Sequence, residues 1–277
     1  MLNRPSTPQK IFYYSMLILL AVVIIFPIYY MFSISLKLPK DIYRDPSLLP
    51  LNATLDNYIE VFTSRDFLTN IQNSLITAGS ATIISVSISC LAAYSLVRLR
   101  YPGRDWIGRL ILFTYLTPGA LLFIPLTVII ARMHLGNSLF GLIFVYLTFS
   151  APLSTWLLMG YFRSIPADLE EQAMVDGATR LQALVRIVMP LAAPGLIAVS
   201  VFTFTAAWNE LLLALIFITS PSKQTVPVAI SYLITGDVFR WGQIMAASVA
   251  AAVPVMVLYY LGQRFVVQGL SAGAVKG

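Results

Sequence analysis

The chain has 277 residues, of which 58% are hydrophobic and 11% charged, and its mean hydropathy is +0.81. Soluble proteins carry about 25% charged residues, so this composition excludes an ordinary soluble domain and predicts a membrane protein with several spans. The formal charge of +6 is compatible with nucleic-acid binding, but its distribution along the chain favours the positive-inside rule of membrane proteins. Cys90 is the single cysteine, so no internal disulfide forms, and its apolar surroundings indicate a small packed side chain.

The first uncharged run, Ile11–Leu36, is 26 residues long and predicts span one. A signal peptide is the alternative, but the apolar core of such a peptide is only about 7–15 residues long. The next segment, Lys37–Asp66, is polar and predicts an outer loop. Within it, Leu55–Phe62 has helical spacing and predicts a short amphipathic helix that begins near Asp56.

Three further spans are predicted within residues 67–162. Phe67–Val97 lacks charge for 31 residues, and its many small side chains suit close helix packing in lipid. Span three is Leu110–Ala131, bent by Pro118 and Pro125, and span four lies within Leu135–Phe162. His134, the only histidine, lies between these spans without a neighbouring pattern of Cys, His or carboxylate residues, so no metal site is predicted.

Span five is interrupted by a carboxylate. The uncharged run Ile187–Asn209 ends at Glu210, and the apolar sequence resumes over Leu211–Ile218. Glu210 is therefore expected inside the span, where an ionisable group is costly and often functional. Two interpretations stay open: Glu210 serves transport, or it is a structural carboxylate that is neutral or hydrogen-bonded to a neighbouring helix.

The remaining segments and the charge distribution set the topology. Thr219–Arg240 is predicted to be an outer loop, Trp241–Gln263 span six, and Arg264–Gly277 a flexible tail. With both termini inside, eleven of the 18 basic residues lie on the inner side, whose net charge is +6 against +1 outside. This asymmetry follows the positive-inside rule and places the segment between spans four and five in the cytoplasm.

The predicted fold class is therefore an all-α polytopic membrane protein with six transmembrane helices and with N and C termini cytoplasmic. Its parts are an N-terminal span with its outer loop (1–66), a core of spans two to six (67–267) and a cytoplasmic C-terminal tail (268–277).

The cytoplasmic elbow, Tyr161–Pro194, is the most polar internal segment of the chain. Its sequence predicts two short helices, each opened by a capping box, with a left-handed helix stop between them. Two prolines then disfavour continuing the second helix in the same register. The residues that carry this pattern are Asp168 with Glu171, Thr179 with Gln182, Gly177, Pro190 and Pro194.

The sequence lacks the patterns of common catalytic sites. There is no glycine-rich phosphate loop, and none of the five lysines follows a glycine. There is no Ser/His/Asp arrangement, no metal-ligand spacing and no pair of intramembrane carboxylates suited to a proton relay. The chain is therefore predicted not to be an enzyme and to need no cofactor. If transport is active, energy is expected to enter from a partner at the elbow.

The elbow resembles a known motif. The run Glu171-Gln-Ala-x-x-Asp-Gly177-Ala, followed by Ile187, Pro190-Leu191 and Pro194, is similar to the EAA loop of binding-protein-dependent ABC importer permeases. It departs from the family pattern at Gln172, where alanine is usual, and at Leu184, where an aromatic residue is common. Three other stretches add to the resemblance. Asn73-Ser74 with Arg100–Gly103 resembles the start of the permease core. Trp208–Glu210 is similar to carbohydrate importers, and Gly269–Gly277 is similar to the tail of the smaller maltose-type permease.

The resemblance implies a non-catalytic, multi-pass permease of a bacterial or archaeal cytoplasmic membrane, with a permease core and a coupling-helix elbow. Its implied partners are a second homologous permease, two ATPase subunits, an extracytoplasmic substrate-binding protein and membrane lipid, with no nucleic acid. The 168–190 loop would dock on the ATPase, and the tail would reach the ATPase interface. The implied coupling residues are Asp168, Leu169, Glu170, Glu171, Ala173, Met174, Asp176 and Gly177, with Glu170 and Glu171 facing a basic rim, and the tail contacts are Ser271, Gly273 and Lys276.

The implied substrate is a carbohydrate, such as a di- or oligosaccharide. Aromatic side chains stack on sugar faces, although aromatics in spans also serve as packing groups and interface anchors. Importers of a polyol, a glycerophosphodiester or an amino acid share the elbow, and a secondary transporter is a further alternative, for which only Glu210 qualifies as an ion-coupling residue. The substrate-path candidates are Tyr146, Phe149, Phe204, Trp208, Asn209 and Glu210.

Overall fold

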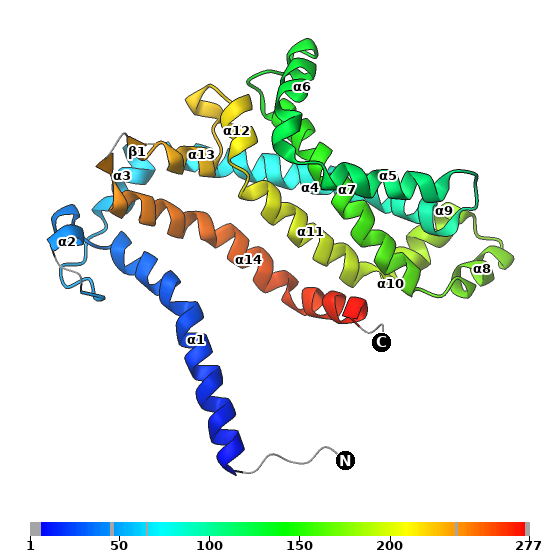
Figure 1. The fold of residues 1–277 in the computed structure, drawn as a ribbon, viewed down its shortest axis with the longest axis horizontal. Coiled ribbons are helices and arrows are strands. Elements are labelled where there is room, and N and C mark those ends of the chain that lie inside the picture. Colours follow the sequence, from blue (N-terminus) through cyan, green and yellow to red (C-terminus); the bar gives the residue numbers. More distant parts are fainter. Residues whose placement is uncertain (1–6, 45–46, 65, 236–237, 275–277) are drawn as a thin grey trace. The chain divides into compact units, whose positions relative to one another are not determined.

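The computed structural model describes residues 7–44, 47–64, 66–235 and 238–274, and most of these residues are helical (Figure 1). Four helices are long and apolar enough to cross a membrane, and two bent helix pairs raise this number to six if each pair is one span. The predicted all-α membrane fold is confirmed in this form. The four long helices are α1 (Thr7–Ser35), α4 (Phe67–Arg98), α7 (Leu139–Ser164) and α14 (Trp241–Ala274).

The two bent pairs correspond to the predicted spans three and five. Helices α5 (Arg104–Leu116) and α6 (Gly119–Arg132) meet at a bend of 101°, and the helical segment 180–191 meets α11 (Ala193–Trp208) at 77°. The first bend lies at Pro118, whose ring disfavours a helical conformation of the preceding residue, and Thr117 is indeed extended. The predicted bend at Pro118 is thus confirmed, whereas Pro125, the second predicted bend position, lies inside α6; neither span is one straight helix.

Short elements connect these helices. The pair of two-residue antiparallel strands was not predicted from the sequence. The connecting elements are α2 (Pro39–Arg44), α3 (Asp56–Ser64), α8 (Asp168–Val175), α9 (Arg180–Ala183), the π-helix η1 (Leu184–Val188), α10 (Met189–Leu191), α12 (Leu212–Phe217), the 3₁₀-helix η2 (Pro221–Lys223), α13 (Val226–Ser231), β1 (Ile234–Thr235) and β2 (Val238–Phe239).

The chain forms two compact units, and the smaller comprises residues 1–67 and 230–252. In this unit the predicted amphipathic helix is confirmed as α3, which begins at Asp56. The buried amide of Asn57 on this helix donates hydrogen bonds of 2.9 Å to the carbonyl oxygens of Ser35 and Lys37. Because the last carbonyls of a helix lack partners within it, Asn57 satisfies the C-terminal end of α1.

The larger unit comprises residues 68–229 and 253–277, and helix α7 packs within it against α5, α6, α11 and α12 (Figure 1). Its core is built from α4, α7, η1 and α11, with Leu158, Phe162 and Val188 fully buried. Hydroxyl groups also link three helices, because Ser154 lies 3.4 Å from Ser85 and 2.9 Å from Thr203. Small residues at helix contacts and interhelical hydrogen bonds are the usual means of association in lipid, as the sequence of α4 predicted.

Gly195, near the start of α11, packs directly against Tyr161 on α7. A Cβ atom at this position would lie 2.4 Å from the ring of Tyr161, far inside contact distance. We expect Gly195→Ala to destabilise the subunit by about 1–3 kcal/mol, as overpacking does, and to lower the temperature at which the purified protein aggregates. Gly160→Ala on α7 is the matched control, because nothing lies within 4 Å of its added Cβ; equal aggregation temperatures for the two variants would contradict this packing.

Candidate functional site

The elbow consists of α8, a glycine turn and a second helical segment formed by α9, η1 and α10. Gly177 has a φ of +93°, so the predicted left-handed stop is confirmed. The N–H groups of Gly177 and Ala178 donate to the carbonyls of Met174 and Ala173 at 3.1 and 2.9 Å, which closes the end of α8. The elbow thus turns sharply at a position that suits glycine because a Cβ is strained there.

The second predicted capping box is confirmed and the first is wrong. The N–H of Thr179 donates to Oε1 of Gln182 at 2.8 Å, and the N–H of Gln182 donates to Oγ1 of Thr179 at 3.3 Å. At the start of α8, however, the N-cap residue is Ala167, and Asp168 is the first helical residue. Because the carboxylate of Asp168 lies within the first turn, it favours the positive end of the helix dipole instead of capping a backbone N–H.

A π-helical turn, Leu184–Val188, follows the capping box and was not predicted. In a regular α-helix the ring of Pro190 would clash with the carbonyl of Arg186, four residues earlier. The wider π turn gives this carbonyl room, and the N–H of Met189 donates to the carbonyl of Leu184 across it. The elbow therefore joins α11 through a non-standard turn and the 77° bend after α10.

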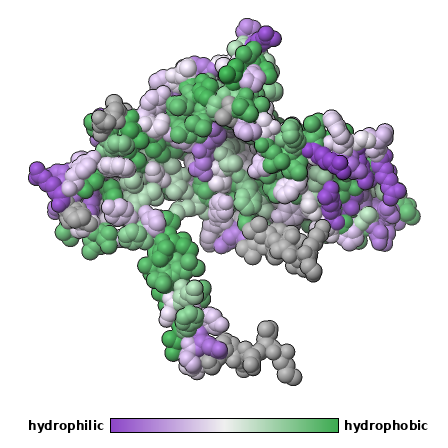
Figure 2. Space-filling model, in the orientation of Figure 1, coloured by the Kyte–Doolittle hydropathy of each residue, from purple (hydrophilic) through white to green (hydrophobic). Residues whose placement is uncertain are grey.

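The predicted coupling residues do not all have the same exposure. Most of those on α8 and its turn are exposed, whereas Ala173 and Met174 are half-buried and Glu170 is buried. Hydrophilic residues gather at the end of the larger unit that carries α8 and α9 (Figure 2). Exposed apolar side chains that the sequence reasoning left out accompany Leu169 here: Val175, Leu181 and Val185.

Glu170 differs from the expectation that both glutamates face a basic rim. Its side chain is only 6% exposed, and its Oε2 atom forms an ion pair with Nε of Arg98 at 3.1 Å. The hydroxyl of Tyr94 donates a hydrogen bond to the other carboxylate oxygen. The expectation failed because both partners lie on α4, more than seventy residues away in sequence, where no local pattern reveals them.

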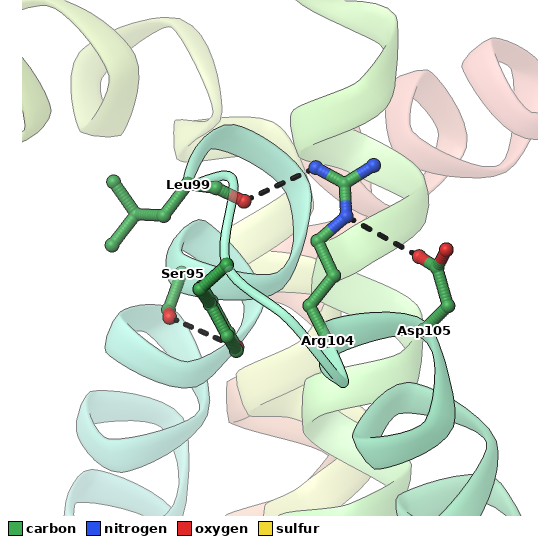
Figure 3. A network of polar contacts seen from close by, with 5 residues as sticks. Ser95, Leu99, Arg104 and Asp105 are labelled. Carbon is green, nitrogen blue, oxygen red and sulfur yellow. Dashed lines mark hydrogen bonds and ion pairs between the residues drawn. The ribbon is translucent and has the colours of Figure 1, made fainter.

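Figure 3 shows the basic turn between α4 and α5, which begins directly after Arg98 in the chain. Arg104 donates to the carbonyl of Leu99 at 3.1 Å and pairs with Asp105 at 3.3 Å, while Ser95 donates to the hydroxyl of Tyr101 at 3.3 Å. The side chain of Asp105 is 81% exposed, so this pair contributes little stability. The turn is instead set by the hydrogen bond from Arg104 to Leu99 and by Gly103, whose φ is +84°.

Among the substrate-path candidates, the structure brings Phe204 and Trp208 together as a stacked pair with ring centroids 5.6 Å apart. Tyr146 and Trp208 are buried, Phe149 and Phe204 are half-buried, and Asn209 is exposed. Ser150 is a further candidate, because its hydroxyl is buried without a hydrogen-bond partner in the part of the chain that the structure describes, whereas the buried hydroxyl of Tyr146 interacts with Glu210.

Glu210 lies in the break between α11 and α12. Its two carboxylate oxygens accept hydrogen bonds from the N–H groups of Leu213 and Ala214 at 2.9 and 3.0 Å. These bonds satisfy the first turn of α12, as an N-terminal cap does. Of the two interpretations, the hydrogen-bonded structural carboxylate therefore agrees with the geometry: the two N–H donors belong to the next helix in the chain, and the hydroxyl of Tyr146 on α7 also interacts with the carboxylate.

Asn137 holds the loop that follows α12, which the sequence predicts to be an outer loop, and this role of Asn137 was not predicted. Its Oδ1 atom accepts from the N–H groups of Thr219 and Ser220, both at 3.1 Å, and its Nδ2 group donates to Ser220 Oγ at 2.7 Å. From the other side, Asn73 on α4 donates to the carbonyls of Ser222 and Gln224 at 3.0 Å. Asn137 has a φ of +49°, a left-handed conformation that asparagine tolerates, and this is the only local feature that distinguishes the residue.

We expect Asn137→Gly to loosen this loop while preserving the left-handed turn. The N–H groups of Thr219 and Ser220 lose their acceptor, and the loss of each such bond costs about 1 kcal/mol. Limited proteolysis measures the effect as faster cleavage within residues 219–224. Asn137→Asp, which retains the acceptor oxygen, is the matched control, and equal cleavage rates for wild type and the glycine variant would contradict this role.

The predicted tail residues are only partly described. Helix α14 continues through Ala274, so the expected flexible tail from Arg264 is wrong for the described residues. Ser271 and Gly273 lie on this helix, their side-chain surroundings are outside what the structure describes, and Lys276 lies outside the described residues altogether.

Comparison with known proteins identifies the family. Residues 85–272 match the family model "Binding-protein-dependent transport system inner membrane component". The chain is 38% identical over 280 residues to the inner membrane ABC transporter permease protein YcjP of Escherichia coli K12, with 100% of both chains covered. It is 37% identical over 264 residues to the trehalose/maltose transport system permease protein MalG of Thermococcus litoralis, with 94% of both chains covered.

A solved structure agrees with this assignment. The match is to a chain of a bacterial ABC transporter involved in the import of the acidic polysaccharide alginate, with 25% sequence identity and a TM-score of 0.77. The alignment covers 95% of this chain and 99% of the other. Permeases of this family act with another permease, ATPases and a binding protein. The chain therefore belongs to the binding-protein-dependent transport family: it is a multi-pass permease subunit of an ABC importer in the cytoplasmic membrane, and ATP is hydrolysed not by this subunit but by its partner ATPases.

Proposed function

We propose that the chain forms part of the pathway for a carbohydrate, a di- or oligosaccharide, paired with a second homologous permease. The observation that carries this proposal is the full-length relation to permeases named for sugars, such as that of Thermococcus litoralis for trehalose and maltose. The trehalose transport system permease protein SugB of Mycobacterium tuberculosis supports it, with 39% identity over 254 residues.

A transport assay with competing solutes tests the substrate class. The chain is co-expressed with its neighbouring permease, ATPase and binding protein, and the complex is reconstituted into liposomes. We expect ATP-dependent uptake of a labelled di- or oligosaccharide that unlabelled sugar suppresses. Uptake of an amino acid, a polyol or a glycerophosphodiester in its place would favour the alternative importers, and ion-driven uptake by this chain alone would identify a secondary transporter.

The substrate path is proposed to run along α7 and the end of α11. The stacked rings of Phe204 and Trp208 present aromatic surface of the kind that packs on sugar faces. The buried hydroxyl of Ser150 would be available to sugar hydroxyls, and Tyr146, which interacts with Glu210, would lie beside it. Phe149 and Asn209 complete the proposed path, whereas Glu210 would shape it by capping α12.

The elbow is proposed to dock on the ATPase from the cytoplasm, with both termini on the same side, in accord with the positive inner charge. One of the two ATPase subunits would receive Leu169, Ala173 and Met174 as apolar contacts. The exposed acids Asp168, Glu171 and Asp176 would meet a basic rim. The outer loop, Thr219–Arg240, would contact the extracytoplasmic binding protein, and no nucleic acid is involved.

The tail residues Ser271, Gly273 and Lys276 are proposed to reach the ATPase interface. We expect truncation after Gly269 to lower the ATPase activity of the complex by several-fold while the subunit still inserts into the membrane. ATPase assays on the purified complex, with membrane fractionation as the control for insertion, measure this. Unchanged ATPase activity would show that the tail is passive.

A further inference from the structure

Glu170 is the only buried carboxylate among the residues that the structure describes, and it lies on a helix whose other acids are exposed. Burying a charge is costly unless it is paired and hydrogen-bonded. Here the carboxylate has both kinds of partner: Nε of Arg98 at 3.1 Å and the hydroxyl of Tyr94. Because Glu170 is buried and already paired within the subunit, contact with the ATPase does not explain its position on α8.

Arg98 joins three elements at one point. It is the last residue of α4, its Nε pairs with Glu170 on α8, and its NH2 group donates to the carbonyl of Ile165 at 2.7 Å. Ile165 is the C-cap residue of α7. The cytoplasmic ends of spans two and four and the start of the coupling helix thus meet at one guanidinium group, whose planar fork holds several acceptors in fixed directions.

The backbone of α8 packs elsewhere, against α9 and η1. Its link to α4 is made by side chains: Glu170 from α8, and Arg98 and Tyr94 from two successive turns of α4. Coupling between distant sites requires a physical connection that moves with both. These three side chains are such a connection between the coupling helix and span two.

We propose that Glu170, Arg98 and Tyr94 form a positioning link that transmits movement of the coupling helix to span two, and that Glu170 is not an ATPase contact. The proposal rests on the proposed docking of the elbow. It adds to that docking account that two adjacent glutamates have different roles. Glu171 is exposed and belongs to the docking surface, whereas Glu170 faces the interior and holds that surface on the bundle.

The test uses the complete complex in liposomes and measures three quantities: co-purification of the ATPase, ATP hydrolysis, and uptake. In Glu170→Gln the hydrogen bond from Tyr94 can persist while the charge is lost. We expect the ATPase to co-purify as in wild type, and uptake per ATP hydrolysed to fall about tenfold, within the ~5–150-fold range of typical coupling effects. Tyr94→Phe, which leaves the ion pair, should give a smaller decrease in the same ratio.

The matched control is Asp105→Asn, the same chemical change in an exposed Arg–Asp pair on the adjacent turn, which should leave the ratio unchanged (Figure 3). Arg98→Glu and Glu170→Arg should each lower uptake per ATP hydrolysed. The double variant that combines them should recover part of this loss. Glu171→Gln serves as the contrast, since it should weaken ATPase co-purification.

Several results would overturn the link. A wild-type ratio in Glu170→Gln would do so, as would loss of the ATPase from that complex, which would make Glu170 a docking residue. If Glu170→Gln fails to accumulate, Tyr94→Phe decides, and a wild-type ratio there would reject the proposal. Failure of the docking account itself is distinguishable, because Glu171→Gln would then leave co-purification of the ATPase unchanged.

Discussion

Replacing Gly177 with valine is expected to uncouple ATP hydrolysis from uptake. Gly177 has a φ of +93°, and a β-branched residue is strongly disfavoured in this region of backbone space. Since nothing lies within 4 Å of an added Cβ, the effect comes from the backbone turn and not from a clash. The turn sets the angle between α8 and α9, so a changed turn misdirects the docking helix.

We expect uptake by the Gly177→Val complex in liposomes to fall by tenfold or more, because about 1.4 kcal/mol of lost coupling already corresponds to a factor of ten. ATP hydrolysis should persist and assembly should be partly retained. Gly177→Asn is the matched control, since asparagine tolerates left-handed conformations and should retain most of the uptake. Normal, coupled uptake by the valine variant would show that the elbow does not require this turn.

Replacing Glu210 with alanine is expected to prevent stable folding of the subunit. The N–H groups of Leu213 and Ala214 would lose their acceptors in an apolar segment where water cannot replace them. Each unsatisfied group costs about 1–3 kcal/mol, so the loss is large compared with the stability of a typical domain. The yield of monodisperse protein in detergent measures the effect.

Glu210→Gln separates the two interpretations of this carboxylate. Glutamine retains one acceptor oxygen, so a structural cap predicts an intermediate yield and near-normal uptake by the protein that folds. A normal yield with abolished uptake would instead assign Glu210 to the transport pathway. Asn209→Ala, at the neighbouring exposed C-cap position of α11, is the control for the yield alone, because Asn209 belongs to the proposed substrate path.

Features that depend on neighbouring residues were predictable. The capping box at Thr179 and the stop at Gly177 each arise within one or two turns, and both are present. The uncharged runs located the long helices because lipid demands continuous apolar length. The break at Pro118 also follows from local sterics, since proline constrains the residue before it.

Features that depend on distant residues were not predictable. The burial of Glu170 requires Arg98 and Tyr94 from another helix, and the locking of the outer loop requires Asn137 from a separate turn. The false capping box at Asp168 shows the limit of spacing alone, because the helix began one residue earlier than the pattern indicates and Ala167 took the N-cap position. The continuation of α14 through Ala274 escaped prediction because glycine disfavours a helix interior while alanine favours it, so the preferences of Gly269 and Gly273 oppose those of Ala272 and Ala274.

The central claim is that this chain has no energy source of its own and is driven through the elbow by an ATPase. ATP-dependent sugar uptake into liposomes is the direct measurement, made with the complete complex, with the complex lacking the ATPase, and with this chain alone. We predict uptake only for the complete complex supplied with ATP and binding protein. Concentrative uptake by this chain alone, or by the complex without the ATPase, would contradict the claim.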